Sequence, residues 1–394
     1  MGKNRTVHYA LINIFYFAAY SGAHAYAAVF LLDRGFSNTL VGVILALANI
    51  LSVVVGPIWA GIIDKYASVT NRRVSMACAT LCAVLCIMLY FVNVMAIVFI
   101  MYVILYTLQM AYQPLIQAMN FEYTAKGDKI NFGLARGLGS CGFAVTSLFT
   151  GRLVAQSGVD KMLIVNVVIF AVGAVLLLTF KNSAICNEEL QEEKIAKRND
   201  SLWGFVKTYP VFMLFVFGGA CLFFSHNALN DYLIQIITPI GGNEEIMGRM
   251  VMLAACLELP AMALFEIVRR KVGIKKILIL SAVMFTVKSL IMFLASNLIM
   301  AYISQVCQMF AYALFIPGAA YLAENIMEQG DKTKGQAYTN MAITLGGVFS
   351  ALVCGRALDQ YGTHTMLGIA TALGAAGTVI MIISILLLGK NKEH

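Results

Sequence analysis

Charge is scarce in this sequence of 394 residues: 12% of them are Asp, Glu, Lys or Arg, whereas 60% are hydrophobic. An average soluble domain carries about 25% charged residues. So few charges cannot cover the surface of a soluble protein of this length. The composition therefore excludes a soluble enzyme, a nucleic-acid-binding module and a secreted disulfide-rich protein.

The sequence also lacks the short motifs of common enzymes. It contains no HExxH, no GxSxG and no glycine-rich phosphate loop, and its five histidines are scattered. An enzyme needs a nucleophile with a base, or a metal cluster. Cys78, Cys82 and Cys86 share one helix face but have no neighbouring His or carboxylate, so we expect them to pack between helices. We therefore expect no enzymatic activity, no cofactor and no metal.

Long apolar runs are abundant instead. Residues 74–106, 162–180 and 366–388 contain no charged residue at all. About 20 apolar residues are enough for a helix to cross ~30 Å of hydrocarbon. The pattern predicts an all-α polytopic membrane protein with twelve spans, near 9–31, 40–63, 74–92, 94–120, 133–155, 162–180, 210–236, 246–268, 276–295, 298–325, 336–358 and 363–388.

The positive charges predict the orientation of these spans. If the N-terminus is cytoplasmic, 21 of the 28 Lys and Arg residues fall on the cytoplasmic side, five fall on the other side, and Arg136 and Lys288 lie inside spans. Cytoplasmic loops of membrane proteins carry such an excess. We expect a plasma-membrane protein with both termini in the cytoplasm, and the net charge of +8 requires no nucleic-acid partner.

The two halves of the chain resemble each other. Six residues from Gly142 to Gly158 recur from Gly346 to Gly362 at a constant offset of 204, within the strings GRLVAQSG and GRALDQYG. Parallel repeats of six spans are a transporter architecture in which the substrate is held between the halves. We expect two pseudo-symmetric six-helix bundles, 1–180 and 210–394, joined by a polar cytoplasmic linker at 181–209.

The loop after the second span carries a family signature. The run Gly61-Ile-Ile-Asp64-Lys65-Tyr66, followed by Arg72-Arg73, resembles the loop 2–3 motif of the major facilitator superfamily. The resemblance implies that these charged residues gate the protein, with the Asp64 carboxylate paired to basic groups in one conformation. The alternative explanation for these basic residues is the general excess of Lys and Arg in cytoplasmic loops. The corresponding turn of the second half, Arg269–Lys271, is expected to lack the acid.

The fifth span resembles one branch of that superfamily. The stretch Phe132 to Ala144, FGLARGLGSCGFA, is similar to the oligosaccharide:proton symporters of the lactose-permease type and to their phenylpropionate- and nucleoside-permease relatives. The resemblance implies that Arg136 binds substrate hydroxyls and that Phe143, at the position of a Trp, stacks on the sugar ring. Lys288 replaces an Arg of that branch, Gln308 replaces its His, and Gln117 replaces a sugar-binding Glu. Ala311 replaces a Glu of the proton-handling stretch.

Charged groups inside spans are functional candidates because each costs roughly 2.5–3.5 kcal/mol to insert. Arg136 can bind substrate, or it can extend to the cytoplasmic surface. Glu258 lies beside Pro260 and near a sugar-binding Glu of the similar branch. Burial disfavours its charged form, so we expect it to bind substrate or to exchange a proton. Lys288 is a substrate-binding candidate or a structural partner of Glu258.

Uncharged and peripheral polar groups complete the candidate site. Asp231 is a second candidate for proton coupling, or an outer salt-bridge residue. Gln117 and Gln308 are substrate-binding candidates whose alternative role is interhelical hydrogen bonding, worth about 0.6 kcal/mol per bond. His24 is a substrate-binding candidate or a packing residue. Asn227 is a further candidate, on one helix face with Asp231.

These patterns predict a gradient-driven transporter. We expect a monomer in the lipid bilayer that takes up a sugar or another small hydroxylated solute, with the proton as coupling ion. A nucleoside or aromatic-acid importer is the main alternative, and a drug exporter is a weaker one. A receptor is disfavoured because the largest polar loop has fewer than 30 residues. The substrate, the stoichiometry and the direction of transport stay open.

Overall fold

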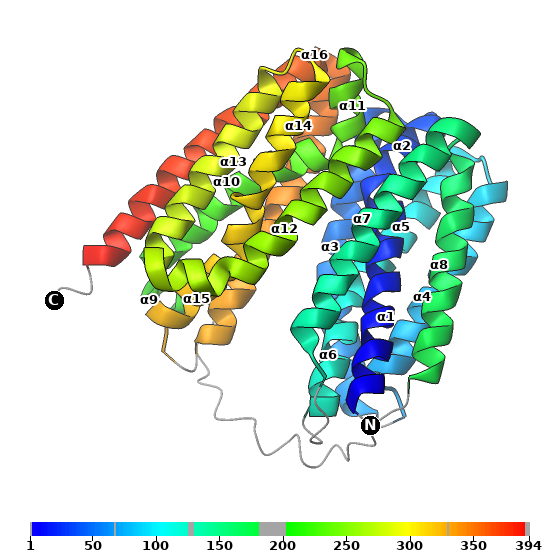
Figure 1. Cartoon of the computed structure of the whole chain (residues 1–394), viewed down its shortest axis with the longest axis horizontal. Helices are drawn as coiled ribbons and strands as arrows, with labels where there is room; N and C mark the ends of the chain where they lie inside the picture. Colours follow the sequence, from blue (N-terminus) through cyan, green and yellow to red (C-terminus); the bar gives the residue numbers. More distant parts are fainter. Residues whose placement is uncertain (1, 67, 125–129, 181–201, 329–330, 391–394) are drawn as a thin grey trace. The chain divides into compact units, whose positions relative to one another are not determined.

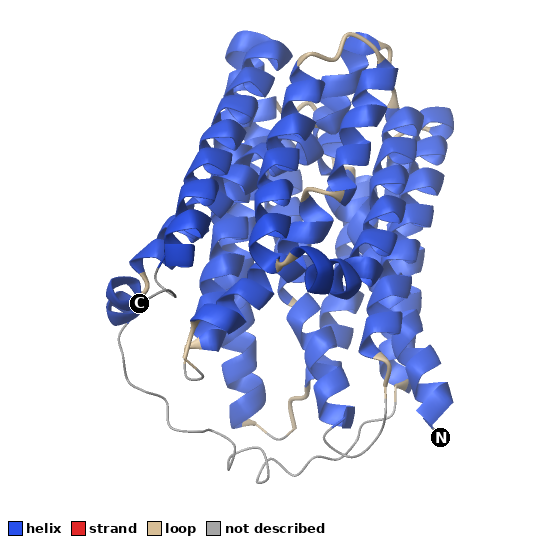
Figure 2. Ribbon diagram, turned by 60° about the vertical axis from the view of Figure 1, so that its left-hand side comes forward, coloured by secondary structure: helices blue, strands red, loops and turns tan. Residues whose placement is uncertain are grey.

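The computed structural model describes residues 2–66, 68–124, 130–180, 202–328 and 331–390. These residues form helices joined by short loops, and no strand occurs among them (Figure 2). The all-α class predicted from the apolar runs is therefore confirmed. Most of the predicted linker, residues 181–201, lies outside the described residues.

The described residues of the first half form eight α-helices and one π-helical turn; Figure 1 labels most of these helices. In chain order they are α1 (Gly2–Tyr20), η1 (Ser21–Ala25), α2 (Ala27–Asp33), α3 (Asn38–Lys65), α4 (Asn71–Phe91), α5 (Met95–Ala111), α6 (Gln113–Thr124), α7 (Phe132–Ser157) and α8 (Asp160–Thr179).

The second half is interrupted more often. Its elements are α9 (Leu202–Thr208), α10 (Pro210–Asp231), α11 (Leu233–Ile237), η2 (Thr238–Ile240), α12 (Glu244–Val272), α13 (Ile274–Phe293), α14 (Leu298–Val306), η3 (Cys307–Met309), α15 (Tyr312–Ile326) and α16 (Lys332–Lys390). The turns η2 and η3 are 3₁₀-helical.

The described residues contain ten or eleven candidate membrane spans. Ten helical segments are long and apolar enough to cross a bilayer, and the pair Arg5–Ala25 and Ala27–Asp33, bent by 44°, counts as an eleventh candidate if it forms one span. The run Lys332–Lys390 is one of the ten, and it contains two helices, because Gly362 interrupts it with a φ of 79°. Its two helices correspond to the last two spans that the hydropathy pattern predicts.

Side-chain caps define where several helices begin. The hydroxyls of Ser37 and Thr70 accept from the amides of Leu40 and Arg73 at 3.3 Å each. Asn131 and Asn297 cap α7 and α14 in the same way. Such caps occupy amides that a helix start leaves without partners.

The chain separates into two compact units. One comprises Met1–Ile195 with Asn243–Ala255, and the other comprises Ala196–Gly242 with Cys256–His394. The two units follow the division of the chain into halves, except that the first residues of α12 group with the first unit. The predicted boundaries at 180 and 210 stay predictions.

Each unit repeats the same internal contacts. In the first unit the Tyr26 hydroxyl donates to the Ser147 carbonyl at 2.7 Å. In the second, the Tyr232 hydroxyl donates to the Ala351 carbonyl, also at 2.7 Å. Both tyrosines lie at a helix break, between η1 and α2 and between α10 and α11. The sequence repeat therefore corresponds to a structural repeat.

Glycines bring the repeated helices close together. A Cβ on Gly142 of α7 would lie 2.6 Å from the Ile14 carbonyl of α1, and a Cβ on Gly346 of α16 would lie 2.6 Å from the Ala220 carbonyl of α10. Small residues allow such close packing in membranes, where no hydrophobic driving force joins helices. In both halves this contact pairs the first span with the fifth.

Candidate functional site

An aromatic cluster surrounds His24 in the first unit. The π-helical turn η1 carries His24 just before the bend at Tyr26. The imidazole lies between Tyr20, with ring centroids 4.4 Å apart, and Tyr106, at 4.2 Å. The Tyr106 hydroxyl forms a hydrogen bond with the His24 ring. His24 is thereby held in place by its neighbours.

Arg136 lies beside the same aromatic side chains. Its guanidinium carbon is 3.9 Å from the centroid of the Phe17 ring, and its Nη1 donates to the Ser140 hydroxyl at 3.3 Å. No ion pair joins Arg136 to a carboxylate within the described part of the chain. Phe143, about two turns further along α7, has its ring centroid 6.0 Å from that of Tyr20. Arg136 and Phe143 therefore belong to one cluster with His24.

A helix break divides the polar residues of the fourth span. Gln109 is 2% exposed, and its carbonyl accepts from the Tyr16 hydroxyl at 2.8 Å. The chain turns at Tyr112, between α5 and α6, and Gln117 follows on α6 as a partly exposed residue. Its assignment to the substrate site stays a prediction.

The second unit contains a buried polar network centred on Lys288. This lysine of α13 is 1% exposed. Its Nζ donates to Oε1 of Gln308 at 2.5 Å and to Oδ1 of Asn230 at 3.5 Å. Two neutral amide oxygens thus hold the ammonium group inside a membrane span, where a charge without partners would be costly.

Gln308 connects this lysine to Glu258. Its Nε2 donates to Oε1 of Glu258 at 2.8 Å, while its Oε1 accepts from Lys288. The 3₁₀ turn η3 carries Gln308 between α14 and α15. Three of the predicted site residues, Lys288, Gln308 and Glu258, are therefore joined in one chain of hydrogen bonds.

His226 extends the network and was not predicted as a site residue. Asn230 Nδ2 donates to His226 Nε2 at 2.8 Å, and the imidazole stacks on Tyr312 with centroids 5.1 Å apart and planes 10° apart. The internal repeat held the signal that could have found it. The shared tyrosines Tyr26 and Tyr232 are 206 positions apart, which aligns His226 with Tyr20 of the aromatic cluster.

Asn227 and Asp231 lie near this network without joining it. The Asn227 amide faces α16, where a Cβ on Gly347 would lie 3.1 Å from its Nδ2. Asp231 is the last residue of α10, next to the break at Tyr232. Asn230 is the residue of this segment that reaches Lys288. Substrate binding by Asn227 and proton coupling by Asp231 stay predictions.

The predicted gate residues have local partners. Arg72 Nη1 donates to the carbonyls of Leu177 at 3.3 Å and Leu178 at 2.7 Å, so it caps the end of α8. Arg73 donates to a backbone carbonyl of its own loop, and Lys65 lies 5.3 Å from the ring centroid of Tyr66. Among the described residues, no ion pair joins Asp64 to a basic group. The gating role stays a prediction.

The second half has an acid at the corresponding turn, so the expectation that it lacks one is wrong. Glu266 accepts from Arg269 Nη2 at 2.6 Å and Nε at 2.9 Å, and from Arg270 Nε at 3.0 Å. The acid precedes the arginines by one helical turn. The sequence expectation considered only Arg269–Lys271, and Glu266 lies three positions before that run.

Glu122 lies just beyond the end of the fourth span. Its carboxylate accepts a hydrogen bond from Asn71. Burial raises the pKa of the Glu122 carboxyl, and the bond from Asn71 opposes this effect in part. The side chain thus ties α6 to the start of α4.

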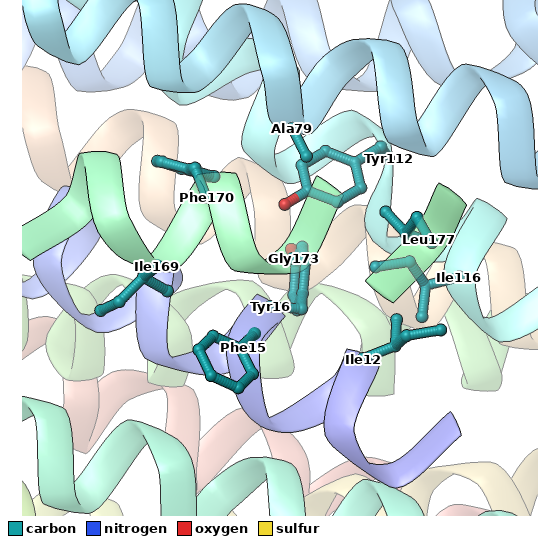
Figure 3. A pocket seen from close by; sticks show the side chains of 10 residues that line it. All are labelled: Ile12, Phe15, Tyr16, Ala79, Tyr112, Ile116, Ile169, Phe170, Gly173 and Leu177. Carbon is teal, nitrogen blue, oxygen red and sulfur yellow. The ribbon is translucent and has the colours of Figure 1, made fainter. Parts of the chain in front are cut away.

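A small hollow in the first unit is lined mostly by apolar groups (Figure 3). It lies among α1, α4, α6 and α8, and its lining residues include Phe15, Tyr16, Tyr112 and Phe170. The predicted site residues do not line it. The candidate residues therefore form a separate polar cluster within each unit, and their role in substrate binding stays a prediction.

Comparisons with known proteins identify the fold and the family. The model of the MFS_1 like family matches residues 6–381. The chain is 22% identical over 388 residues to the uncharacterized transporter YwbF of Bacillus subtilis (strain 168), covering 95% of this chain and 94% of that protein.

Solved structures are similar over nearly the whole length. A mutant of the nucleoside transporter NupG has a TM-score of 0.82 at 13% identity, covering 98% of this chain and 99% of that one. A D-xylose-proton symporter has a TM-score of 0.73 at 15% identity, covering 97% of both chains. The chain belongs to the MFS_1 like family and is a multi-pass membrane transporter of the major facilitator superfamily.

Proposed function

We propose that the chain is a proton-coupled importer of a sugar or a similar small hydroxylated solute. The observation that carries this proposal is the buried chain of hydrogen bonds from Lys288 through Gln308 to Glu258. Two opposite charges connected through an amide inside membrane spans are costly to maintain. Such groups in transporters mark substrate and ion pathways.

Glu258 is the proposed proton-binding group. A carboxylate in a span loses hydration, and its neutral form is favoured unless a partner compensates its charge. Lys288 and Gln308 provide that compensation here. A substrate hydroxyl that replaces Gln308 at Glu258 changes the compensation, so substrate binding and protonation are coupled at one carboxyl group.

Arg136 and Phe143 are the proposed substrate contacts of the first unit. Phe17 and Ser140 hold the Arg136 guanidinium, which has five N–H donors in all. Remaining donors suit a pair of substrate hydroxyls. The partly exposed Phe143 ring offers an apolar face to the substrate ring. Gln117, Asn227 and His24 supply further hydrogen bonds in this proposal.

A nucleoside is the second candidate substrate. The aromatic rings around His24, together with Phe143, provide the stacking surfaces that a planar base would use. The similarity to the nucleoside transporter NupG agrees with this candidate, although 13% identity establishes only the fold. Both candidate substrates carry hydroxyl groups, so the same polar network serves either one.

Transport by the full chain in proteoliposomes tests the proposal. Labelled sugars, nucleosides and aromatic acids are supplied separately, with and without a proton gradient. We expect accumulation of a sugar or a nucleoside that stops when the gradient is collapsed. Glu258→Gln is expected to abolish accumulation but to keep exchange of labelled for unlabelled substrate.

Two controls make this result decisive. Glu328→Gln changes a carboxylate outside the network and is expected to accumulate substrate normally. Arg136→Ala is expected to lower the affinity for substrate by tenfold or more, since a hydrogen bond to a charged group contributes about 1.5–3 kcal/mol. If Arg136→Ala and Glu258→Gln both transported like the natural protein, the proposed site would be wrong.

We also propose that the protein is a monomer in the plasma membrane with both termini in the cytoplasm. The distribution of Lys and Arg supports this orientation. Asp64, Lys65, Arg72 and Arg73 then lie at the cytoplasmic gate. Labelling of single cysteines by a membrane-impermeant reagent in whole cells checks the orientation: position 334 should be protected and position 161 should react.

A further inference from the structure

A turn rich in positive charge joins α12 to α13. Gly273 makes the turn with a φ of 84°, and five basic residues lie between Arg269 and Lys276. We use the name basic turn for Arg270, Lys271, Lys275 and Lys276. Neither the transport site nor the gate accounts for this concentration of charge.

Only part of this charge is neutralised by the protein. Glu266 makes two hydrogen bonds to Arg269 and one to Arg270, and the Arg269 guanidinium also lies 4.4 Å from the ring centroid of Tyr321. Lys271, Lys275 and Lys276 have no ion pair with any residue that the structure describes. Three positive charges thus remain within six positions.

The position of two of these lysines increases the positive potential. Lys275 and Lys276 lie in the first turn of α13, which has no acidic residue and no side-chain cap. The start of a helix carries a partial positive charge, so cations are unfavourable there and anions are favourable. An external anion would relieve this repulsion.

An exposed apolar face begins at the same place. Along α13, exposed side chains follow Lys276 at helical spacing: Leu280 is 45% exposed, Val283 is 37% exposed and Leu290 is 42% exposed. The opposite side of the helix is buried, with Leu278 at 0% and Phe285 at 1%. The surface therefore combines a cationic end with an apolar strip several turns long.

The corresponding turn of the first half lacks these properties. There Arg72 caps α8, and Arg73 binds a carbonyl of its own loop. Both arginines therefore donate hydrogen bonds to backbone carbonyls of the protein itself. The free lysines of the basic turn are a particular feature of the second half, beyond the general positive-inside pattern.

We propose that the basic turn and the exposed face of α13 bind an anionic phospholipid. The phosphate group lies against Lys271, Lys275 and Lys276, and one acyl chain lies along Leu280 and Val283. Charge complementarity selects the anionic headgroup, and the apolar strip selects a lipid over a soluble anion. Anionic lipids attract juxtamembrane basic segments with about 1 kcal/mol per Lys or Arg.

Thermal unfolding of the full-length protein in detergent tests this proposal. The protein is titrated with phosphatidylglycerol, with phosphatidylcholine of the same acyl chains, or with glycerol phosphate. We expect phosphatidylglycerol to stabilise the protein at the lowest concentration. The double variant Lys275→Gln/Lys276→Gln should need about thirtyfold more phosphatidylglycerol for half of the effect, since two lysines contribute about 1 kcal/mol each.

A matched variant controls for net charge. Lys332→Gln/Lys334→Gln also removes two positive charges, but these lysines are paired with Glu324 at 3.6 Å and Asp331 at 2.9 Å. It should respond to phosphatidylglycerol like the natural protein. Equal responses of both double variants, or equal stabilisation by phosphatidylcholine, would overturn the proposal. Stabilisation by glycerol phosphate at the same concentration would overturn the role of the apolar strip.

Discussion

The two halves share a scaffold and differ in chemistry. Tyr26 and Tyr232 make the same 2.7 Å hydrogen bond at equivalent helix breaks. Around the first break lies an aromatic cluster with His24, whereas near the second lies a network of charges and amides around Lys288. The repeat thus preserves these two backbone contacts, while the polar side chains near the breaks have diverged.

The charged residues around the α3–α4 and α12–α13 connections differ in the same way. In the first half, Arg72 caps a neighbouring helix and Asp64 has no ion pair within the described residues. In the second half, Glu266 binds Arg269 and Arg270 on its own helix. In the first half, Arg72 therefore contacts the separate helix α8, whereas the ion pairs of the second half lie within α12 and only Arg269 also contacts α15, at Tyr321.

Of the variants considered, Lys288→Met should cause the largest loss of stability, because, of these two clusters, only that of the second half contains a buried charge. Lys288→Met leaves the Glu258 charge without its buried counter-charge, so we expect a loss of about 3 kcal/mol in unfolding free energy. The double variant Lys288→Met/Glu258→Gln should recover part of the loss. Thermal unfolding in detergent measures both, with Lys332→Met, at a partly exposed lysine, as control. A double variant less stable than Lys288→Met would show that the charges do not compensate each other.

Enlarging the repeated glycines should have the next largest effect, and it should be similar in both halves. Gly142→Ala and Gly346→Ala each place a Cβ 2.6 Å from a carbonyl oxygen of the neighbouring helix. We expect each to cost about 2 kcal/mol, because the helices must move apart. Gly137→Ala is the matched control on α7, since its Cβ would meet no atom within 4 Å. Destabilisation by only one of the two would contradict a shared scaffold.

Removal of the equivalent hydroxyls should have a smaller effect, again equal in both halves. Tyr26→Phe and Tyr232→Phe each leave one buried carbonyl with one hydrogen bond fewer, which should cost about 1 kcal/mol. The measurement is the same thermal unfolding, and Tyr361→Phe, whose side chain is 68% exposed, should be neutral. Clearly unequal losses would mean that the two hydrogen bonds serve different purposes.

Glu122→Gln should have the smallest effect, and the size of this effect should depend on pH. Burial raises the pKa of Glu122 in the folded protein, so its ionised form costs stability at pH 7.5. The Gln variant avoids that cost and can keep the bond to Asn71. We expect a rise in melting temperature of roughly 1–2 °C at pH 7.5 that disappears at pH 4. A larger rise in melting temperature at pH 4 than at pH 7.5 would contradict a raised pKa for Glu122.

The fold could be predicted because long apolar runs have few alternatives in a membrane. Twelve spans and the repeat followed from residue patterns such as Gly142 with Gly346. The breaks at Tyr26, Tyr232 and Cys307–Met309 could not be predicted. They depend on contacts with other helices, which the order of residues along one span does not reveal.

The candidate site was predicted in part. Lys288, Gln308 and Glu258 stood out because polar groups in spans are rare, and hydrogen bonds connect all three. His226 and Phe17 were missed. A histidine in an apolar span is ambiguous in sequence, and a phenylalanine shows no sign that an arginine will lie 3.9 Å from its ring.

The amide of Gln308 gives the buried network a polarity that can be reversed. Its oxygen faces the ammonium group and its nitrogen faces the carboxylate. Rotation of the amide by 180° exchanges these two ends without changing its position. A glutamine at this point can therefore pair an acid and a base in either order, whereas an ionised carboxylate in its place could only accept hydrogen bonds. Evolution can exchange the two charges across Gln308 and keep every hydrogen bond between them.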